Sequence, residues 1–433
     1  MIKDNKFSPI IVSVFFVASV KISTLLIKNF YSENVLLQNI GTANGIFSKP
    51  ASNFPNFLDY FIVISYISIL ILLYKFDWFL NNKSIKNIFY FSSIFLALLL
   101  ITTSIVFQEF RGWDLSLYCV TDISKDIRDA KVNIYDFEYQ KIKPGLSPLI
   151  WLVYNKICNF SVGGFSYLNI YFWIQMFFGT ALVIKYFNFS ILECICLSTG
   201  LNLSMLAMVR TGNYGYIFAI IMAIALRNLV QGHRVNINIV LLAVITFFKL
   251  QYLVVIFLFL VLQKMNLRMF LNISIKFSGI YLAYFGLQLL IFRKSFTDFI
   301  NLLINGYLTN ELGFEAGINN PVVSQFISRF FIVNLNIGIF IVLVVVIVGI
   351  YSLKNNNSKF LIATSLFNRN KNYDSNYLLT AIENKFVTEF IFVFCFVPNI
   401  LFLLGSIFSL GPLSELLYVP GLFYVVMLSN KRS

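Results

Sequence analysis

The sequence predicts an all-α, polytopic membrane protein with about twelve transmembrane helices. Hydrophobic residues make up 58% of the chain and charged residues only 12%, whereas a soluble domain has roughly 25% charged residues. Apolar runs of about 18 or more residues recur along the whole chain, which is the pattern of membrane-spanning segments. Because lipid offers the backbone no hydrogen-bond partners, runs this long indicate helices and not barrel strands.

The expected helices follow these runs in order. The N-terminal run resembles a signal anchor without a small-residue cleavage site, so we count it as the first span. Residues 236–262 form a longer apolar stretch that Lys249 and Gln251 interrupt, so we expect two short helices forming a hairpin there. Outside this hairpin, the expected spans are 9–27, 58–75, 88–107, 164–186, 190–208, 212–229, 269–292, 331–351, 387–408 and 413–429.

The segment "PGLSPLIWLVYNKI" (144–157) decides the topology, because it is only about half the usual span length. If it is re-entrant, both termini are cytoplasmic and the cytoplasmic links are rich in Lys and Arg, as the positive-inside rule requires. If it crosses, the later links flip and "RNLVQGHR" (227–234) faces outward. We favour the re-entrant topology, in an integral multi-pass protein of the cell inner or plasma membrane.

Charge and topology together divide the chain. The net charge of +14 is scattered between the apolar runs, which fits cytoplasmic links and anionic membrane lipid and argues against nucleic acid as a partner. Two long loops face outward, 108–163 and 293–330. The parts in order are two N-terminal transmembrane helices (1–87), a main transmembrane core (88–351), a mobile cytoplasmic linker (352–386) and a C-terminal transmembrane hairpin (387–433).

An acid follows the third span at the expected outer surface, in "FQEFRGWDLSLYCVTD" (107–122). Polar residues after Asp114, among them Tyr118 and Asp122, recur at three- and four-residue spacing and predict an amphipathic helix lying on the membrane. Asp114 is then either the N-cap of that helix or a catalytic carboxylate. The one histidine, His233, is expected in the cytoplasm, which excludes histidine-based general base catalysis at the outer face.

Four segments follow one another in an order that resembles a known family. They are "GWDLSLYCVTDISKDIRDAKVNIYDFEYQKIKPGLSPLIWLVY" (112–154), "VRTGNYGYIFAIIMAIAL" (209–226), "FFKLQYLVVIFLFLV" (247–261) and "NNPVVSQFISRF" (319–330). Together they look like the GT-C superfamily of membrane glycosyltransferases, most of all its polyprenol-phosphate-mannose-dependent family 87. The sequence departs from that family where Lys249 precedes Leu and not Pro, and in a C-terminal part without a Trp-His-Tyr-like element.

The resemblance implies an inverting hexosyltransferase, similar to a mannosyltransferase of cell-envelope glycans. The donor would be a hexose or pentose on polyprenyl phosphate, and the acceptor a lipid-linked or glycan hydroxyl at the extracytoplasmic face. Asp114 would be the general base. Residues expected to bind the donor phosphate are Arg210, Lys249, Arg293 and Arg329. Residues expected to contact substrate are Tyr118, Asp122, Asn213, Gln251 and Asn320.

No cofactor is required by the sequence, and no cluster of ligands supports a divalent metal. The sequence also has no nucleotide-binding loop, no paired Cys/His metal motif and no GxSxG element. Two other function classes stay open. An O-antigen-type polysaccharide polymerase would favour arginines in 293–330, and a non-enzymatic flippase or transporter would favour repeated halves and broken helices at mid-membrane.

Overall fold

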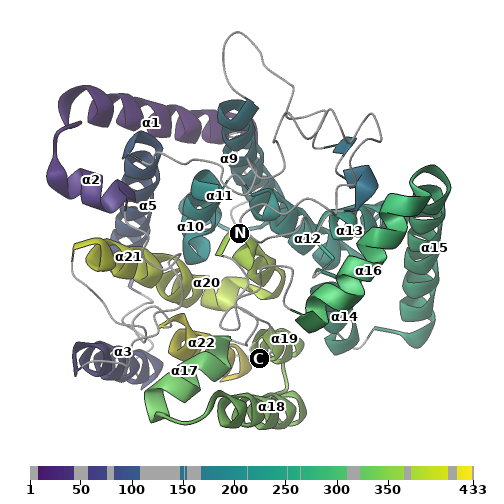
Figure 1. The fold of residues 1–433 in the computed structure, drawn as a ribbon. Helices are drawn as coiled ribbons and strands as arrows, with labels where there is room; N and C mark the ends of the chain where they lie inside the picture. Colours follow the sequence, from purple (N-terminus) through teal and green to yellow (C-terminus); the bar gives the residue numbers. More distant parts are fainter. Residues whose placement is uncertain are drawn as a thin grey trace. The chain divides into compact units, whose positions relative to one another are not determined.

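The computed structural model describes residues 8–42, 57–75, 82–107, 147–150, 152–153, 167–211, 213–250, 252–263, 265–309, 322–364, 372–407 and 417–431. All regular structure in these ranges is helical, in agreement with the predicted all-α class (Figure 1). The elements are α1 (Pro9–Phe30), α2 (Val35–Thr42), α3 (Phe57–Lys75), α5 (Lys83–Phe107), α9 (Tyr167–Tyr186), α10 (Ile191–Gly200), η3 (Leu201–Leu203), α11 (Ser204–Thr211), α12 (Gly215–Val230), α13 (Val235–Phe248), α14 (Tyr252–Leu262), α15 (Leu267–Ile291), α16 (Arg293–Thr309), α17 (Val322–Phe331), α18 (Leu335–Ser352), α19 (Asn356–Ala363), η5 (Asn372–Ala381), η6 (Asn384–Phe386), α20 (Val387–Ile391), η7 (Phe392–Phe396), α21 (Val397–Ile407) and α22 (Tyr418–Lys431).

Seven helical segments of the described chain are long and apolar enough to cross a membrane, so the protein is a multi-pass α-helical membrane protein. On α1, α15 and α18 most of the surface is exposed and apolar, as expected for helices that face lipid. The seven segments are Pro9–Phe30, Phe57–Lys75, Lys83–Phe107, Ile191–Arg210, Leu267–Ile291, Leu335–Ser352 and Asn384–Ser406.

The expected pair of short helices in 236–262 is present as α13 and α14, both apolar. α13 ends just before Lys249, and α14 begins at Tyr252. Local sequence explains several other helix starts. Ser190 accepts from the backbone N–H of Glu193, whose side chain accepts in turn from the Ser190 N–H, and this capping box begins α10. Asn266 and Asn334 cap α15 and α18 through their side-chain oxygens.

The chain folds into two compact units, each discontinuous in sequence. Unit 1 comprises residues 1–111, 172–223 and 320–433, and unit 2 comprises 112–171 and 224–319. The N-terminal helices and the C-terminal hairpin therefore belong to the same unit, although about 300 residues of sequence separate them.

Within unit 1, α5 runs in the same direction as the segment α10–α11. Near the start of α5, the Tyr90 hydroxyl donates to Glu193 Oε1 over 2.8 Å. Near its end, Ser104 Oγ accepts from Arg210 Nε over 3.1 Å. Residue numbers rise in the same direction along both segments, so α5 and α10–α11 are parallel. If both cross a membrane, the chain between them must cross it an odd number of times.

Helices α3 and α22 form a second parallel pair. In α3 and α22, Tyr66 lies against Gly421, and Lys431 Nζ donates to the carbonyl oxygen of Tyr74 over 3.4 Å. The end of α18 joins the same face of unit 1, because the N–H of Lys354 donates to Asn430 Oδ1 over 2.8 Å. The ends of α3, α18 and α22 therefore meet on one face.

The segment α10–α11 is broken near its middle. Asn202 and Leu203 have φ angles of 45° and 60°, in the left-handed region, so the helical hydrogen-bond ladder stops there. The break is closed by η5: Asn202 Nδ2 donates to Ser375 Oγ over 3.0 Å, and Ser204 Oγ pairs with Asn376 Oδ1 over 3.1 Å. Polar side chains at membrane depth need such partners from the protein.

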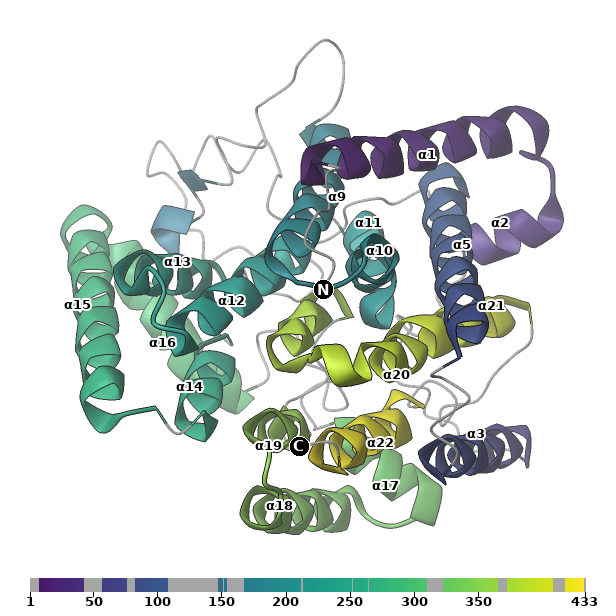
Figure 2. The same ribbon diagram turned by 180° about the vertical axis from the view of Figure 1, so that it is seen from behind.

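Residues 352–386, which the sequence predicts to be a mobile linker, are folded into unit 1 where the structure describes them. Side chains of α19, and of η5 from Ser375 onward, are buried inside the unit, and Figure 2 shows α19 beside α22. The Asn-rich flanks that predict a linker act instead as caps and surface around short apolar stretches. Buried apolar residues of this segment are Phe360, Leu361, Ala363, Leu379, Ala381 and Phe386.

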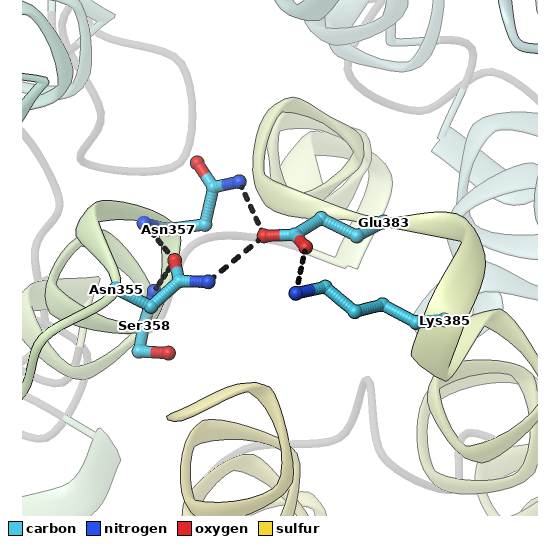
Figure 3. Close-up of polar contacts among 5 residues, drawn as sticks. All are labelled: Asn355, Asn357, Ser358, Glu383 and Lys385. Carbon is cyan, nitrogen blue, oxygen red and sulfur yellow. Dashed lines mark hydrogen bonds and ion pairs between the residues drawn. The ribbon is translucent and has the colours of Figure 1, made fainter. Parts of the chain in front are cut away.

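Polar contacts fix the start of this segment to its end (Figure 3). Asn355 Oδ1 accepts from the N–H of Asn357 over 2.7 Å and begins α19. Glu383 Oε1 accepts from the side-chain amides of Asn355 and Asn357 over 3.1 and 2.9 Å. Lys385 Nζ pairs with Glu383 Oε2 at 3.4 Å. Glu383 thus joins the chain after α18 to the chain before α20.

In unit 2 the short segment around 147–153 packs against the C-terminal part of α15. The hydroxyls of Ser147 and Tyr284 form a hydrogen bond, and the N–H of Leu149 donates to Gln288 Oε1 over 3.2 Å. The ring of Phe247, from the end of α13, stacks on Tyr284. The beginning of this segment therefore lies beside the ends of α13 and α15.

Candidate functional site

The residues predicted to bind substrate fall into three groups. Arg210, Asn213 and Arg329 lie in unit 1, while Lys249 and Arg293 lie in unit 2. The remaining predicted site residues are outside the described residues: Asp114, Tyr118, Asp122, Gln251 and Asn320. The amphipathic helix expected after Asp114 is outside them as well.

Arg210 ends the membrane segment α10–α11 and is buried, with only 5% of its surface exposed. Its Nε and Nη2 atoms both donate to Ser104 Oγ, over 3.1 and 2.9 Å. Nη2 also donates to the carbonyl oxygens of Ile40 and Gly41 in α2, over 3.4 and 3.1 Å. These described contacts, to oxygen atoms of α5 and α2, hold the guanidinium in one orientation.

Two packing features support this arrangement. The ring of Phe402, on α21, lies 4.8 Å from Arg210 Cζ and covers one face of the guanidinium. Gly41 allows α2 to approach α5 closely, because a Cβ atom at this position would lie 2.5 Å from the carbonyl oxygen of Thr103. Without that approach the carbonyls of α2 would not reach Arg210.

Asn213 lies in the turn between α11 and α12, and its side chain shapes that turn. Its Oδ1 accepts from the backbone N–H of Gly215 over 2.8 Å, which begins α12. Its backbone oxygen accepts from the Nε2 of Gln175, on α9, over 3.5 Å. The side chain of Asn213, a predicted substrate contact, thus caps α12, and its backbone oxygen contacts α9.

Arg329 lies in α17 and is partly exposed. Its backbone oxygen and that of Phe330 lie 3.5 and 3.2 Å from the hydroxyl of Tyr60, which donates to them. Next to Tyr60, in the first turn of α3, Asp59 is fully buried. Sequence reasoning did not single out this carboxylate, although an acid in the apolar run "FLDYFIVISY" is a signal of its own.

The two predicted cations of unit 2 lie at helix ends. Lys249 is the C-cap of α13 and its Nζ lies 5.5 Å from the centre of the Tyr252 ring. Arg293 is the first residue of α16 and is exposed. Arg210 is therefore the most deeply buried of the predicted cations that the structure describes.

Chemically, the neighbourhood of Arg210 can orient an anion. A guanidinium held in place by Ser104 and by the carbonyl oxygens of α2 is a planar, permanently charged group, a kind of group that suits phosphate oxygens. Sequence reasoning found Arg210 but missed Ser104 and Gln175, although a lone Gln inside the apolar "FWIQMFF" is a polar residue in a predicted span. No protein-family model, curated protein or solved structure matches this chain.

Proposed function

We propose that this protein is a membrane glycosyltransferase that uses a polyprenyl-phosphate sugar as donor at the extracytoplasmic face. In the proposed step, the oxygen of an acceptor hydroxyl attacks the anomeric carbon and forms the new glycosidic bond. The bond from that carbon to the phosphate oxygen breaks, and the electron pair leaves with polyprenyl phosphate. The hydroxyl proton passes to a carboxylate, for which Asp114 is the candidate. The anomeric centre inverts.

The observation that carries this proposal is the buried and oriented guanidinium of Arg210. A charged side chain inside a membrane bundle is costly and is retained mainly where it serves a function. In a water-poor site it stabilises negative charge developing on a leaving phosphate more strongly than in bulk water. Arg210 also lies at the beginning of the segment 209–226, which is similar to the family's Gly-Gln/Asn stretch at a helix start.

Topology supports the side on which Arg210 would act. The parallel course of α5 and α10–α11 favours a single return through α9, with 144–157 re-entrant, and about twelve crossings in all. The links that meet at the ends of α3, α18 and α22 are the Lys/Arg-rich ones, which we assign to the cytoplasm with both termini. Arg210 and Phe107 then lie toward the outer surface, and Asp114 follows Phe107 by seven residues.

The break in α10–α11 is a feature that transporters also use at their binding sites. Here the polar side chains at the break bond to one another, since Asn202 bonds to Ser375 and Ser204 to Asn376. A network satisfied in this way explains the break as packing. We therefore place the transporter second.

The deciding experiment uses the purified full-length protein in lipid nanodiscs. A panel of polyprenyl-phosphate sugars is supplied with a lipid-linked glycan acceptor, and both the elongated acceptor and released polyprenyl phosphate are measured. We expect one donor sugar to be transferred, with equal amounts of the two products. A protein that moves these lipids between leaflets of a vesicle but leaves every donor intact is a transporter, and the proposal is then wrong.

A further inference from the structure

Gln175, on α9, is a buried amide that the contacts within its unit do not satisfy. Only 2% of the residue is exposed. Its Nε2 donates to the backbone oxygen of Asn213 over 3.5 Å, which is a long hydrogen bond. In the described part of the chain its Oε1 accepts no hydrogen bond. A buried acceptor of this kind lowers stability unless something else donates to it, so it calls for an explanation.

The orientation of this amide follows from its one partner. The backbone oxygen of Asn213 can only accept, so the nitrogen end of Gln175 must face it. The oxygen end therefore points away from Asn213. A group that meets Oε1 must be a donor, such as a hydroxyl or an amine. An ionised phosphate, which offers only acceptor oxygens, does not fit this position.

The neighbourhood of Gln175 links it to the candidate phosphate site of unit 1. Asn213 follows Arg210 by three residues, in the turn that leaves α11. Gln175 contacts this turn from α9, while Ser104 and α2 hold Arg210. One unit thus brings a fixed cation, suited to phosphate, and an unsatisfied neutral acceptor, suited to a hydroxyl, to the same end of α11.

We propose that Gln175 is a specificity-determining residue, whose Oε1 accepts a hydrogen bond from one hydroxyl of the donor sugar. This inference rests on the proposed glycosyltransferase function and names a residue that binds the sugar rather than the phosphate. A site built around a substrate hydroxyl discriminates against an analogue that lacks it, because the buried acceptor is then left without its donor. Discrimination between a donor sugar that has this hydroxyl and an analogue that lacks it should therefore require Gln175.

The test compares donors as well as variants. The donor sugar that the wild type transfers and its set of monodeoxy analogues, all on polyprenyl phosphate, are assayed with wild type and Gln175→Leu. We expect the wild type to use one monodeoxy donor about tenfold less efficiently in kcat/KM. For the parent donor, the kcat/KM of Gln175→Leu should be about tenfold below that of the wild type. For that one analogue, the kcat/KM of Gln175→Leu should be no lower than its value for the parent donor.

Thr180→Val is the matched control. Thr180 is also on α9 and is also fully buried. Its replacement should leave the ranking of donors unchanged. If Gln175→Leu does not fold, Gln175→Met, which keeps the length of the side chain, is used in the same comparison.

The outcomes separate the two proposals. An equal loss by the Gln175 variant on every donor, or no loss on any, overturns the role of Gln175 while sugar transfer by the wild type upholds the proposed function. A wild-type protein that transfers no sugar from any polyprenyl phosphate overturns both.

Discussion

Replacing Arg210 by Lys tests whether Arg210 binds the donor phosphate or only holds α2 in place. The change keeps the positive charge but replaces a planar fork with a single ammonium nitrogen. Among the described residues, the guanidinium donates to three acceptors, Ser104 Oγ and the carbonyl oxygens of Ile40 and Gly41, over 2.9 to 3.4 Å. A lysine at this position is not expected to reach all three, so the cation loses its fixed orientation.

The magnitude follows from these bonds. A hydrogen bond to a charged group contributes about 1.5–3 kcal/mol, so the loss of one oriented contact to phosphate should weaken donor binding about 10- to 150-fold. Ser104→Ala is a milder form of the same test. It keeps the guanidinium and its carbonyl partners in α2 but removes the acceptor that Nε and Nη2 share. About 1 kcal/mol, or roughly fivefold in donor affinity, is expected.

The assay is equilibrium binding of a radiolabelled polyprenyl-phosphate sugar to the protein in nanodiscs of neutral lipid. Thermal stability is recorded in parallel on the same samples. Arg268→Lys makes the same chemical change at an exposed position near the start of α15 and should leave both quantities unchanged. If Arg210→Lys lowers the unfolding temperature while donor affinity stays within about twofold of wild type, Arg210 only fastens α2 and the phosphate binds elsewhere.

Three further predictions follow from the fold and the proposed chemistry. Asp114→Asn should lower turnover about 10²- to 10⁴-fold with normal expression and donor binding, and Asp122→Asn should do much less; wild-type transfer by the first variant would make Asp114 a helix cap. In a chain whose native cysteines are Ser, a membrane-impermeant thiol reagent should label Glu33→Cys but not Lys354→Cys in intact cells, and the reverse pattern would invert our topology. Asn376→Leu should lower the free energy of unfolding by about 1–3 kcal/mol, measured by denaturant titration, because it leaves Ser204 Oγ without that partner; an unchanged stability would show that the break does not need η5.

The spans were predictable because apolar length is a local property of sequence. Each predicted span from 9–27 to 212–229, and from 269–292 onward, has described helix over most of its length. The break at Asn202 was not predictable, because no proline marks it and its partners come from η5, far along the chain. For the same reason η5 itself was misread: an Asn-rich composition is typical of a linker, and only the partner across the unit shows that Asn376 is a buried residue.

The candidate site was predictable in part. Arg210 stands out in sequence because a charge at the end of an apolar run needs a reason. Its partners do not, since two of them are backbone oxygens of α2, about 170 residues earlier in the chain, and backbone groups carry no sequence signature. Gln175 was visible as a polar residue in a span, but its unsatisfied oxygen becomes evident only when the turn at Asn213 is placed beside it.

The broken segment α10–α11 also has a consequence for how the chain is made. Its polar partners, Ser375 and Asn376, are synthesised 173 and 172 residues after the groups they bond. At a translation rate of about 5–20 residues per second, that interval is roughly 10–35 s. During this time the polar side chains of Asn202 and Ser204 lack these partners, and an unpaired polar group in lipid is costly. The nascent span must wait beside the insertion machinery or in contact with water, and a ribosome paused before residue 372 would leave it exposed to membrane quality control.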